Sequence, residues 1–336
     1  MSENEQDYII ETTDTATVQP PRFPVVAQLT ILGFILFAIL GFSVLPLLRG
    51  EITETTEAVP VSPLVIAGTS TNLALAQKMS EVTVRGKSAF VYDVKAKRVL
   101  YQKNADTVLP LASITKLMTS LITHELVETD AKIVVPKSAV FQSGESGLRE
   151  GDVLTTQALV DYAMLSSSND AAYALAAAVG TILEPNSNPQ QTFVTSMNIR
   201  AEELGLPNLT FYNPTGLDIS LTEPGAVGTA REVTFLMEYI LSNYPSILEP
   251  STFTSTRVYD TGGAYHQAEN TNPIVTQIPN LLGSKTGYTD LAGGNLTVAF
   301  DAGYNRPIIV TVMGSSYDER FTDVLKLVTA VTGTIE

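Results

Sequence analysis

The sequence predicts an α+β fold, in which one β-sheet is assembled from both ends of a domain and covered by helices. Two strand-like runs, 88–94 and 98–102, flank a short Lys-Ala-Lys turn and predict a hairpin near the start of the domain. Two further strand-like runs, 295–300 and 307–312, are joined through a turn that contains glycine and asparagine. Helical periodicity fills the stretch between these pairs, so we expect the early and late strands to share one sheet.

The intervening helices are predicted from apolar residues that recur every three or four positions. The expected helices cover 113–127, 154–179 with a break at 166–169, 192–204 closed by Gly205, 229–244 and 319–331. A proline, Pro110, stands just before the first of them. No internal repeat is visible, which argues against a solenoid or a propeller.

Composition excludes several classes of function. The chain has 336 residues, of which 44% are hydrophobic, enough for one large domain or two ordinary ones. Its formal charge of −15 argues against a nucleic-acid partner, because phosphate backbones are bound by clusters of lysine and arginine. There is no cysteine, and His124 and His266 are the only imidazoles. Without a His-x-x-x-His or cysteine pair, we expect no bound metal and no cofactor.

The segment from Val25 to Leu48 is apolar and carries no charge, so it is predicted to be a transmembrane helix. A buried core helix is a weaker alternative because such a helix rarely lacks a polar face. A cleaved signal peptide is the other alternative. The acidic head over 1–24 is the wrong kind of n-region for one, and no small-x-small site closely follows the apolar run.

The sequence around this span predicts four regions. Residues 1–24 form an acidic, disordered cytoplasmic tail, 25–48 the span, 49–80 a linker and 81–336 the catalytic domain. Arg22 precedes the span and Arg49 follows it, so the distribution of positive charge does not decide the orientation. The side of the membrane on which the large domain lies therefore depends on its chemistry.

Three short motifs carry the chemical signal. Ser113-Ile-Thr-Lys116 is the one Ser-x-x-Lys of the chain, and it is followed by Ser167-Ser-Asn169 and then by Lys285-Thr-Gly287. Each motif alone is common by chance. All three in this order, with the first at a helix start and the last in a strand-like run, are typical of a serine acyltransferase whose base is a lysine.

The chemistry of the first motif follows from its helical spacing. Residues i and i+3 lie on one face of a helix, so Lys116 is expected beside the hydroxyl of Ser113. A lysine acts as a base only when it is neutral, so burial or a second cation such as Lys285 has to lower its pKa. The helix start also favours a developing oxyanion near the backbone N–H of Ser113.

Each motif also has an ordinary structural explanation when it is taken alone. Ser113 has the position of a helix N-cap, Ser167 and Asn169 that of a helix break, and Lys285-Thr-Gly that of a simple turn. A Ser-His-Asp arrangement is disfavoured, because His124 lies about 16 Å along the helix of Ser113 by helical rise. Because all three motifs occur in one chain and in this order, a catalytic site is favoured over the three separate structural explanations.

At this level of detail the chain resembles a known family. The run from Ala105 to Thr119 is similar to the nucleophile region of D-alanyl-D-alanine carboxypeptidases, the low-molecular-mass penicillin-binding proteins. Further similar stretches are Gly151–Thr155, Ser167–Ala171, Asn213–Leu217, Thr229–Glu232 and Gly283–Asp290. The similarity extends over about 87–331. It implies a penicillin-recognising serine transferase fold, with an antiparallel sheet flanked by helices and an all-helical lobe. In this chain the transmembrane helix predicted from the apolar run would precede that domain.

The resemblance also implies a role for each matching residue. Ser113 would be the acylated nucleophile, Lys116 its base, and Ser167 the relay of a proton to the departing D-alanine. Asn169 would bind the amide of the substrate. Its terminal carboxylate would be bound by Lys285, Thr286 and Arg320. The backbone N–H groups of Ser113 and Tyr288 would form the oxyanion hole.

The resemblance implies peptidoglycan stem peptides as substrate and β-lactam antibiotics as covalent inhibitors. It places the catalytic domain outside a bacterial cell membrane, with the N-terminal span in place of the C-terminal anchor of many relatives. A D,D-endopeptidase that cuts cross-links remains an alternative, as does a catalytically silent scaffold that binds the wall. A class A β-lactamase is disfavoured because the expected Glu-x-x-Leu-Asn is absent; its nearest match, 203–208, is predicted to be a helix end.

Overall fold

The computed structural model describes residues 67–142 and 147–333. The predicted tail, the predicted span over 25–48 and most of the predicted linker lie outside the described residues. Within the described ranges, no helix combines the length and the apolar character needed to cross a bilayer.

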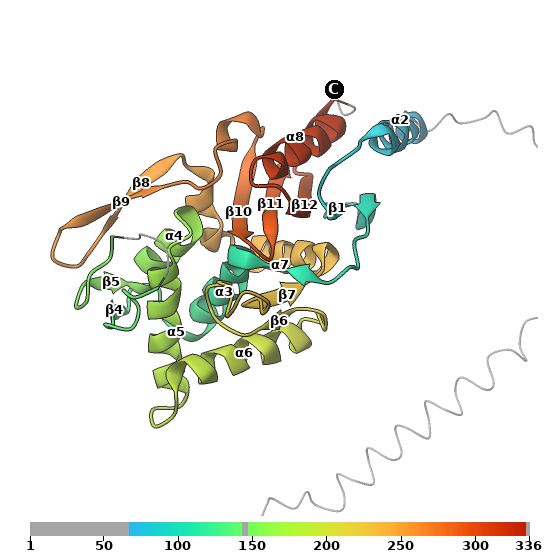
Figure 1. The fold of residues 1–336 in the computed structure, drawn as a ribbon. Helices are drawn as coiled ribbons and strands as arrows, with labels where there is room; N and C mark the ends of the chain where they lie inside the picture. The colour runs from blue at the N-terminus through green and yellow to red at the C-terminus, as the bar shows by residue number, and fades with distance from the viewer. Residues whose placement is uncertain (1–66, 143–146, 334–336) are drawn as a thin grey trace, which may run out of the picture. The chain divides into compact units, whose positions relative to one another are not determined.

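The central element is a five-stranded antiparallel sheet with the strand order β10-β11-β12-β1-β2 (Figure 1). Its strands are β1 (Ser88–Asp93), β2 (Arg98–Lys103), β10 (Leu281–Thr289), β11 (Gly293–Asp301) and β12 (Pro307–Ser315). The early strand β1 pairs with the late strand β12 over their full facing lengths. The predicted assembly of one sheet from both ends of the domain is therefore confirmed, although β11 and β12 extend beyond the predicted runs.

Helices cover both faces of this sheet because successive side chains of each strand point to opposite faces. On one face, Val91, Val298 and Val310 pack in a core with α2 (Ala67–Glu81) and α8 (Glu319–Thr332). On the other face, Phe90 and Ile309 join a larger core with α7 (Ala230–Asn243) and the helical lobe. Figure 1 shows α8 near α2, and α8 packs against α2 and against β11 and β12 of the sheet.

The predicted helical lobe is present between the early and late strands. Its helices are α3 (Lys116–Leu126), α4 (Thr156–Leu165), α5 (Asn169–Leu183) and α6 (Pro189–Glu203). Short 3₁₀ helices are η2 (Ala112–Thr115), η3 (Pro245–Ile247), η4 (Glu249–Thr252) and η5 (Val275–Gln277). The helix α3 packs against α4, α5, α6 and α7, which makes it the central helix of the domain.

Three small sheets were not predicted. They are formed by β3 (Leu109–Pro110), β7 (Ala226–Gly228) and β6 (Thr210–Phe211), by β4 (Lys132–Val134) and β5 (Val153–Thr155), and by β8 (Ser255–Tyr259) and β9 (Tyr265–Glu269). Their strands have two to five residues, too few for an alternating pattern to be distinctive.

The predicted boundary between linker and catalytic domain at residue 81 is wrong. Residues 67–80, assigned to the linker, belong to helix α2, and its Leu75 and Met79 are buried to 2% and 1% exposure. These two side chains share a core with Val324 and Leu327 of α8. The sequence pattern did not reveal this helix because Leu73, Leu75 and Met79 are its only large apolar residues, too few for a distinct helical period.

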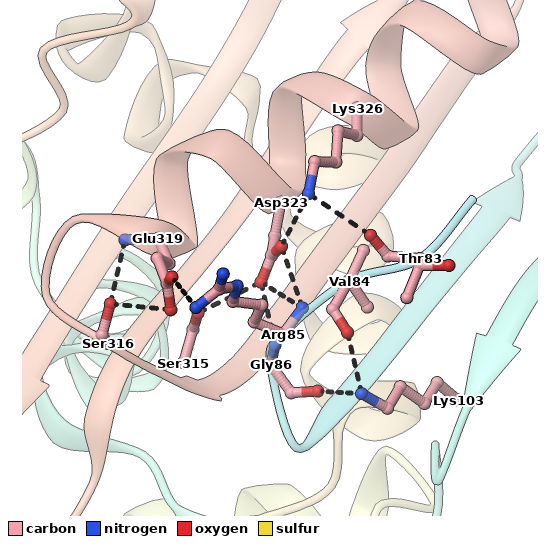
Figure 2. A network of polar contacts seen from close by, with 10 residues as sticks. All are labelled: Thr83, Val84, Arg85, Gly86, Lys103, Ser315, Ser316, Glu319, Asp323 and Lys326. Atoms are coloured by element: carbon pink, nitrogen blue, oxygen red, sulfur yellow. Dashed lines mark hydrogen bonds and ion pairs between the residues drawn. The ribbon is translucent and has the colours of Figure 1, made fainter.

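A buried carboxylate of the last helix, α8, binds the segment that precedes the first strand, β1. Asp323 of α8 is fully buried and accepts hydrogen bonds from the backbone N–H groups of Arg85 and Gly86, at 3.0 and 2.8 Å (Figure 2). The hydroxyl of Ser315, the last residue of β12, donates to the same carboxylate at 3.1 Å. One side chain thus fixes the segment before β1, the end of β12 and the second turn of α8.

Replacing Asp323 by alanine is expected to lower the free energy of unfolding by about 2–4 kcal/mol, because buried N–H groups lose their acceptor. Urea denaturation measures the change. Glu319→Gln is the matched control in the same network, since the Arg85–Glu319 pair is largely exposed and worth about 0.5 kcal/mol. An Asp323→Ala loss no larger than that of the control would contradict the anchoring role.

Candidate active site

The nucleophile candidate lies in a strained turn at the start of the central helix. Ser113 is in the 3₁₀ turn η2, which leads directly into α3, and the preceding Ala112 has a left-handed φ of 48°. Such a conformation is costly for a residue with a Cβ and is commonly retained at functional sites. The side chain of Ser113 caps neither helix. Its ordinary explanation as an N-cap is therefore wrong.

Lys116 is the most enclosed charged residue of this region. Its Nζ lies 2.8 Å from Ser113 Oγ, 2.7 Å from Asn169 Oδ1 and 2.9 Å from the carbonyl oxygen of Thr215. The side chain is fully buried. Burial, and then the positive charge of Lys285, hold the pKa of Lys116 well below its ordinary value. Both predicted causes of a neutral lysine are present.

The second motif forms the predicted break between two helices. The helix α4 ends at Leu165, and Ser168 caps α5 by accepting a hydrogen bond from the N–H of Ala171 at 3.0 Å. Ser167, between them, has a left-handed φ of 59°. This turn places the Ser167 hydroxyl toward Lys285 and the Asn169 amide toward Lys116.

The third motif lies on β10, the edge strand of the sheet. Lys285 Nζ donates to Ser167 Oγ at 2.8 Å and to the carbonyl of Thr286 at 3.1 Å. Burial, assisted by the charge of Arg320, lowers the pKa of Lys285 to about 7. The simple-turn explanation of this motif is therefore wrong, because Lys285, Thr286 and Gly287 are all strand residues.

Arg320 of α8 reaches the same strand. It is buried to 3% exposure, and its Nη1 donates to the carbonyl of Gly287 at 2.7 Å. Its guanidinium lies 4.6 Å from the ring centroid of Tyr317 and 6.0 Å from that of Tyr288. Burial lowers the pKa of Arg320 as well. Three basic side chains, from α3, β10 and α8, thus lie near one another: Lys285 lowers the pKa of Lys116, and Arg320 lowers that of Lys285.

Close backbone approach joins β10 to the nucleophile turn. A Cβ on Gly287 would lie 2.8 Å from the carbonyl oxygen of Leu111 and 3.1 Å from the backbone nitrogen of Ser113, so only glycine fits. Asn295 of β11 holds the same turn by donating to the carbonyl of Leu111 at 3.0 Å. The N–H of Ser113 and the residue after Gly287, Tyr288, are therefore brought to one place.

Two contributors to this geometry were missed from the sequence. Thr215 acts through its backbone carbonyl on Lys116, and its turn is fixed by Gly216, where any Cβ would collide with the carbonyl of Ala112. The similarity of 213–217 to the family is the one sequence signal for this turn. Asn295 had no signal, because a single amide in a strand has no characteristic spacing.

The two histidines are apart from this cluster. His124 stacks edge-on against Tyr244, and burial lowers its pKa. His266 of β9 stacks on Tyr162, and its Nε2 lies 3.4 Å from a carboxylate oxygen of Asp152. The partner of the Ser113 hydroxyl is Lys116, so the rejection of a Ser-His-Asp triad is confirmed. Among the described residues, no group of acidic and histidine side chains is arranged to hold a metal.

Solved structures of penicillin-binding proteins share this fold. The ampicillin-bound penicillin-binding protein D2 of Listeria monocytogenes matches with a TM-score of 0.63 and 28% identity, over 74% of this chain and 98% of that one. A variant of the Streptomyces K15 DD-transpeptidase matches with a TM-score of 0.67 and 25% identity, over 75% and 100% of the two chains. The predicted penicillin-recognising α+β fold is confirmed for the described domain.

Sequence comparison matches the chain to D-alanyl-D-alanine peptidases. D-alanyl-D-alanine carboxypeptidase DacF of Bacillus subtilis is 30% identical over 75% of this chain and 63% of its own length. The D-alanyl-D-alanine endopeptidase of Escherichia coli is 29% identical over 76% of this chain and 78% of its own. The chain thus spans less than two thirds of DacF. The peptidase S11 family model, described as D-alanyl-D-alanine carboxypeptidase, matches residues 75–317, and the chain belongs to this family.

Proposed function

We propose that the protein is a serine-type D-Ala-D-Ala carboxypeptidase, which removes the terminal D-alanine of peptidoglycan stem peptides through an acyl-enzyme on Ser113. The observation that supports this function best is the pair of lysine–serine contacts. Lys116 meets Ser113 at 2.8 Å, and Lys285 meets Ser167 at 2.8 Å. One pair is suited to activate a nucleophile and the other to protonate a leaving group.

Acylation begins with transfer of the Ser113 proton to neutral Lys116. The freed oxygen attacks the carbonyl carbon of the penultimate D-alanine, and the N–H groups of Ser113 and Tyr288 stabilise the resulting oxyanion. Asn169, held by Lys116 at 2.7 Å, offers its amide N–H to the carbonyl side of the substrate. The C–N bond then breaks, and the terminal D-alanine leaves.

Departure of D-alanine requires a proton on its nitrogen and a binding site for its carboxylate. Ser167 relays the proton, supplied through Lys285. The carboxylate is bound by the hydroxyl of Thr286 and by the charges of Lys285 and Arg320, which face the same end of β10. Water then hydrolyses the acyl-enzyme. A penicillin, which carries a carboxylate beside a strained amide, acylates the same serine and acts as a covalent inhibitor.

The location of the enzyme follows from its substrate. We propose that Val25–Leu48 anchors the chain as a single span in a bacterial cell membrane and that the catalytic domain lies outside, where peptidoglycan is found. The support is the length of the apolar run and its lack of charge. Retention in the membrane pellet after alkaline washing, with loss of retention when 1–48 is deleted, checks the anchor.

The deciding test is release of D-alanine from a pentapeptide that ends in D-Ala-D-Ala, measured with the purified protein and with Ser113→Ala. Release that disappears in the variant supports the proposal. Cleavage of a cross-linked stem-peptide dimer without release from the pentapeptide favours a D,D-endopeptidase, the activity named for the Escherichia coli relative. Folded protein with neither activity and no penicillin labelling favours a wall-binding scaffold.

The pH dependence of kcat/KM is expected to be bell-shaped. Activity rises as Lys116 loses its proton and falls as Lys285, with a pKa of about 7, loses the charge that binds the carboxylate. The positive charge of Arg320 contributes to the lowered pKa of Lys285, so Arg320→Gln is expected to move the alkaline limb to higher pH. Pentapeptide hydrolysis between pH 5 and 10 measures both limbs. If the alkaline limb is unchanged in Arg320→Gln, the loss of activity at high pH is not caused by deprotonation of Lys285.

A further inference from the structure

A residue outside the three motifs touches the carboxylate-binding end of the site. Thr271 follows β9, and its hydroxyl lies 2.5 Å from the hydroxyl of Thr286. Its backbone N–H donates to the carbonyl of Leu165, the last residue of α4 before the Ser167 turn, at 3.2 Å. Thr271 is exposed, whereas Thr286 is buried to 4% exposure. Thr271 thus lies at the solvent side of the pair, between two motifs of the site.

The backbone around Thr271 is held in place by the two asparagines that flank it. Asn270 donates its amide to the carbonyls of Ser251 and Phe253, at 2.8 and 2.7 Å. Asn272 is buried to 1% exposure, and its amide donates to the hydroxyl of Ser284, next to Lys285, at 3.2 Å. This turn is therefore fixed to η4 on one side and to β10 on the other, and the position of the Thr271 hydroxyl is set before a ligand arrives.

The direction of the hydrogen bond between the two hydroxyls follows from their proton count. Each threonine hydroxyl has one proton to donate and two lone pairs. If Thr286 gives its proton to a substrate carboxylate, the proton between the two oxygens has to come from Thr271. Lys285 and Arg320 are buried cations whose positions are fixed by hydrogen bonds to Ser167 and Gly287. The hydroxyl of Thr286, by contrast, can rotate about its C–O bond. A hydrogen bond donated to Thr286 is therefore needed to fix the direction in which it donates its own proton.

We propose that Thr271 is a positioning residue for carboxylate recognition: it donates its hydroxyl proton to Thr286 and thereby directs the Thr286 proton to the ligand. The two hydroxyls and the carboxylate form a short chain, in which each hydrogen bond polarises the next. The ligand class is a D-amino acid carboxylate, or the equivalent carboxylate of a penicillin. This inference rests on the proposed function for the natural substrate, but the penicillin reaction tests it separately.

The test is a double-mutant cycle on the full chain, with Thr271→Val, Thr286→Val and both together. The rate constant for acylation by benzylpenicillin and kcat/KM for the pentapeptide are measured for each variant. Thr271→Val is expected to lower both by about 3- to 10-fold, the effect of one hydrogen bond. Because Thr271 acts through Thr286, the double variant should be no slower than Thr286→Val alone. Thr271→Ser restores the hydroxyl and should recover most of the loss.

A second readout separates carboxylate recognition from a structural role. With the methyl ester of benzylpenicillin, which lacks the carboxylate, Thr271→Val should acylate as fast as the parent protein. Losses that are multiplicative in the double variant, or equal for the acid and the ester, would overturn the proposal. If penicillin acylates the parent protein but the pentapeptide is not hydrolysed, the proposed carboxypeptidase activity is refuted. The rates of acylation by penicillin then still test the role of Thr271. Absence of both reactions refutes both proposals.

Discussion

Replacing Ser113 by alanine is expected to abolish covalent labelling by a penicillin and to lower D-alanine release by at least about 10⁴-fold. Ser113 Oγ lies 2.8 Å from Lys116, a buried lysine whose pKa is held well below its ordinary value. Ser167 also lies beside a buried lysine, Lys285, but its proposed role is to protonate the leaving group. Loss of the oxygen removes the atom that forms the acyl bond. Mass spectrometry of the penicillin-treated protein measures the label, and chromatography of the released amino acid measures turnover.

The chain offers a matched control on the helix that follows the nucleophile turn. Ser120 of α3 is fully buried, and its hydroxyl has no hydrogen-bond partner among the described residues. Ser120→Ala therefore removes a serine hydroxyl from α3 without leaving a partner unsatisfied, and stability should change little. Full labelling in Ser120→Ala and none in Ser113→Ala would locate the chemistry at Ser113. Labelling of Ser113→Ala at the parent rate would disprove the assignment.

The parts of the fold that the sequence predicted are those with a strong local pattern. The hairpin of β1 and β2 and the late strands are short runs that contain β-branched and aromatic residues and are separated by turn residues, and helix α7 follows the 3.6-residue spacing. Helix α6 begins at Pro189, three residues before its predicted start, because Asn188 caps it and accepts from Gln190 and Gln191. A cap followed by proline is a local signal, and this boundary was open to prediction.

The parts of the site that the sequence did not predict depend on contacts between distant segments. Lys116 meets the carbonyl of Thr215, which is 99 residues away, and Thr286 meets Thr271 through a turn after an unpredicted hairpin. A backbone carbonyl has no residue-type signature, and a lone threonine has many ordinary uses. The motifs identify the side chains that react, whereas the groups that orient them emerge only when the chain is folded.

Replacing Lys116 is expected to have an effect as large as loss of Ser113, and the choice of substituent separates two roles for its amine. Neutral lysine has two N–H donors and one lone pair. Asn169 Oδ1 at 2.7 Å and the carbonyl of Thr215 at 2.9 Å take both donors, so the lone pair is directed at the Ser113 hydroxyl. Lys116→Met removes the base and is expected to slow acylation by at least about 10³-fold at pH 7.

Lys116→Arg tests whether proton acceptance or positive charge is needed. Arginine keeps a cation in the site but stays protonated in proteins, so it cannot accept the Ser113 proton. Both variants are therefore expected to be slow, and adding Ser113→Ala should cost no further activity, because the two residues act as one unit. Stopped-flow acylation by a chromogenic β-lactam measures the rates. If Lys116→Arg kept a rate within tenfold of the parent, Lys116 would act as a cation, and the Ser113 proton would have to go to another group. The lowered pKa of Lys116 argues against that outcome, since a site built to exploit its charge would not bury it beside Lys285.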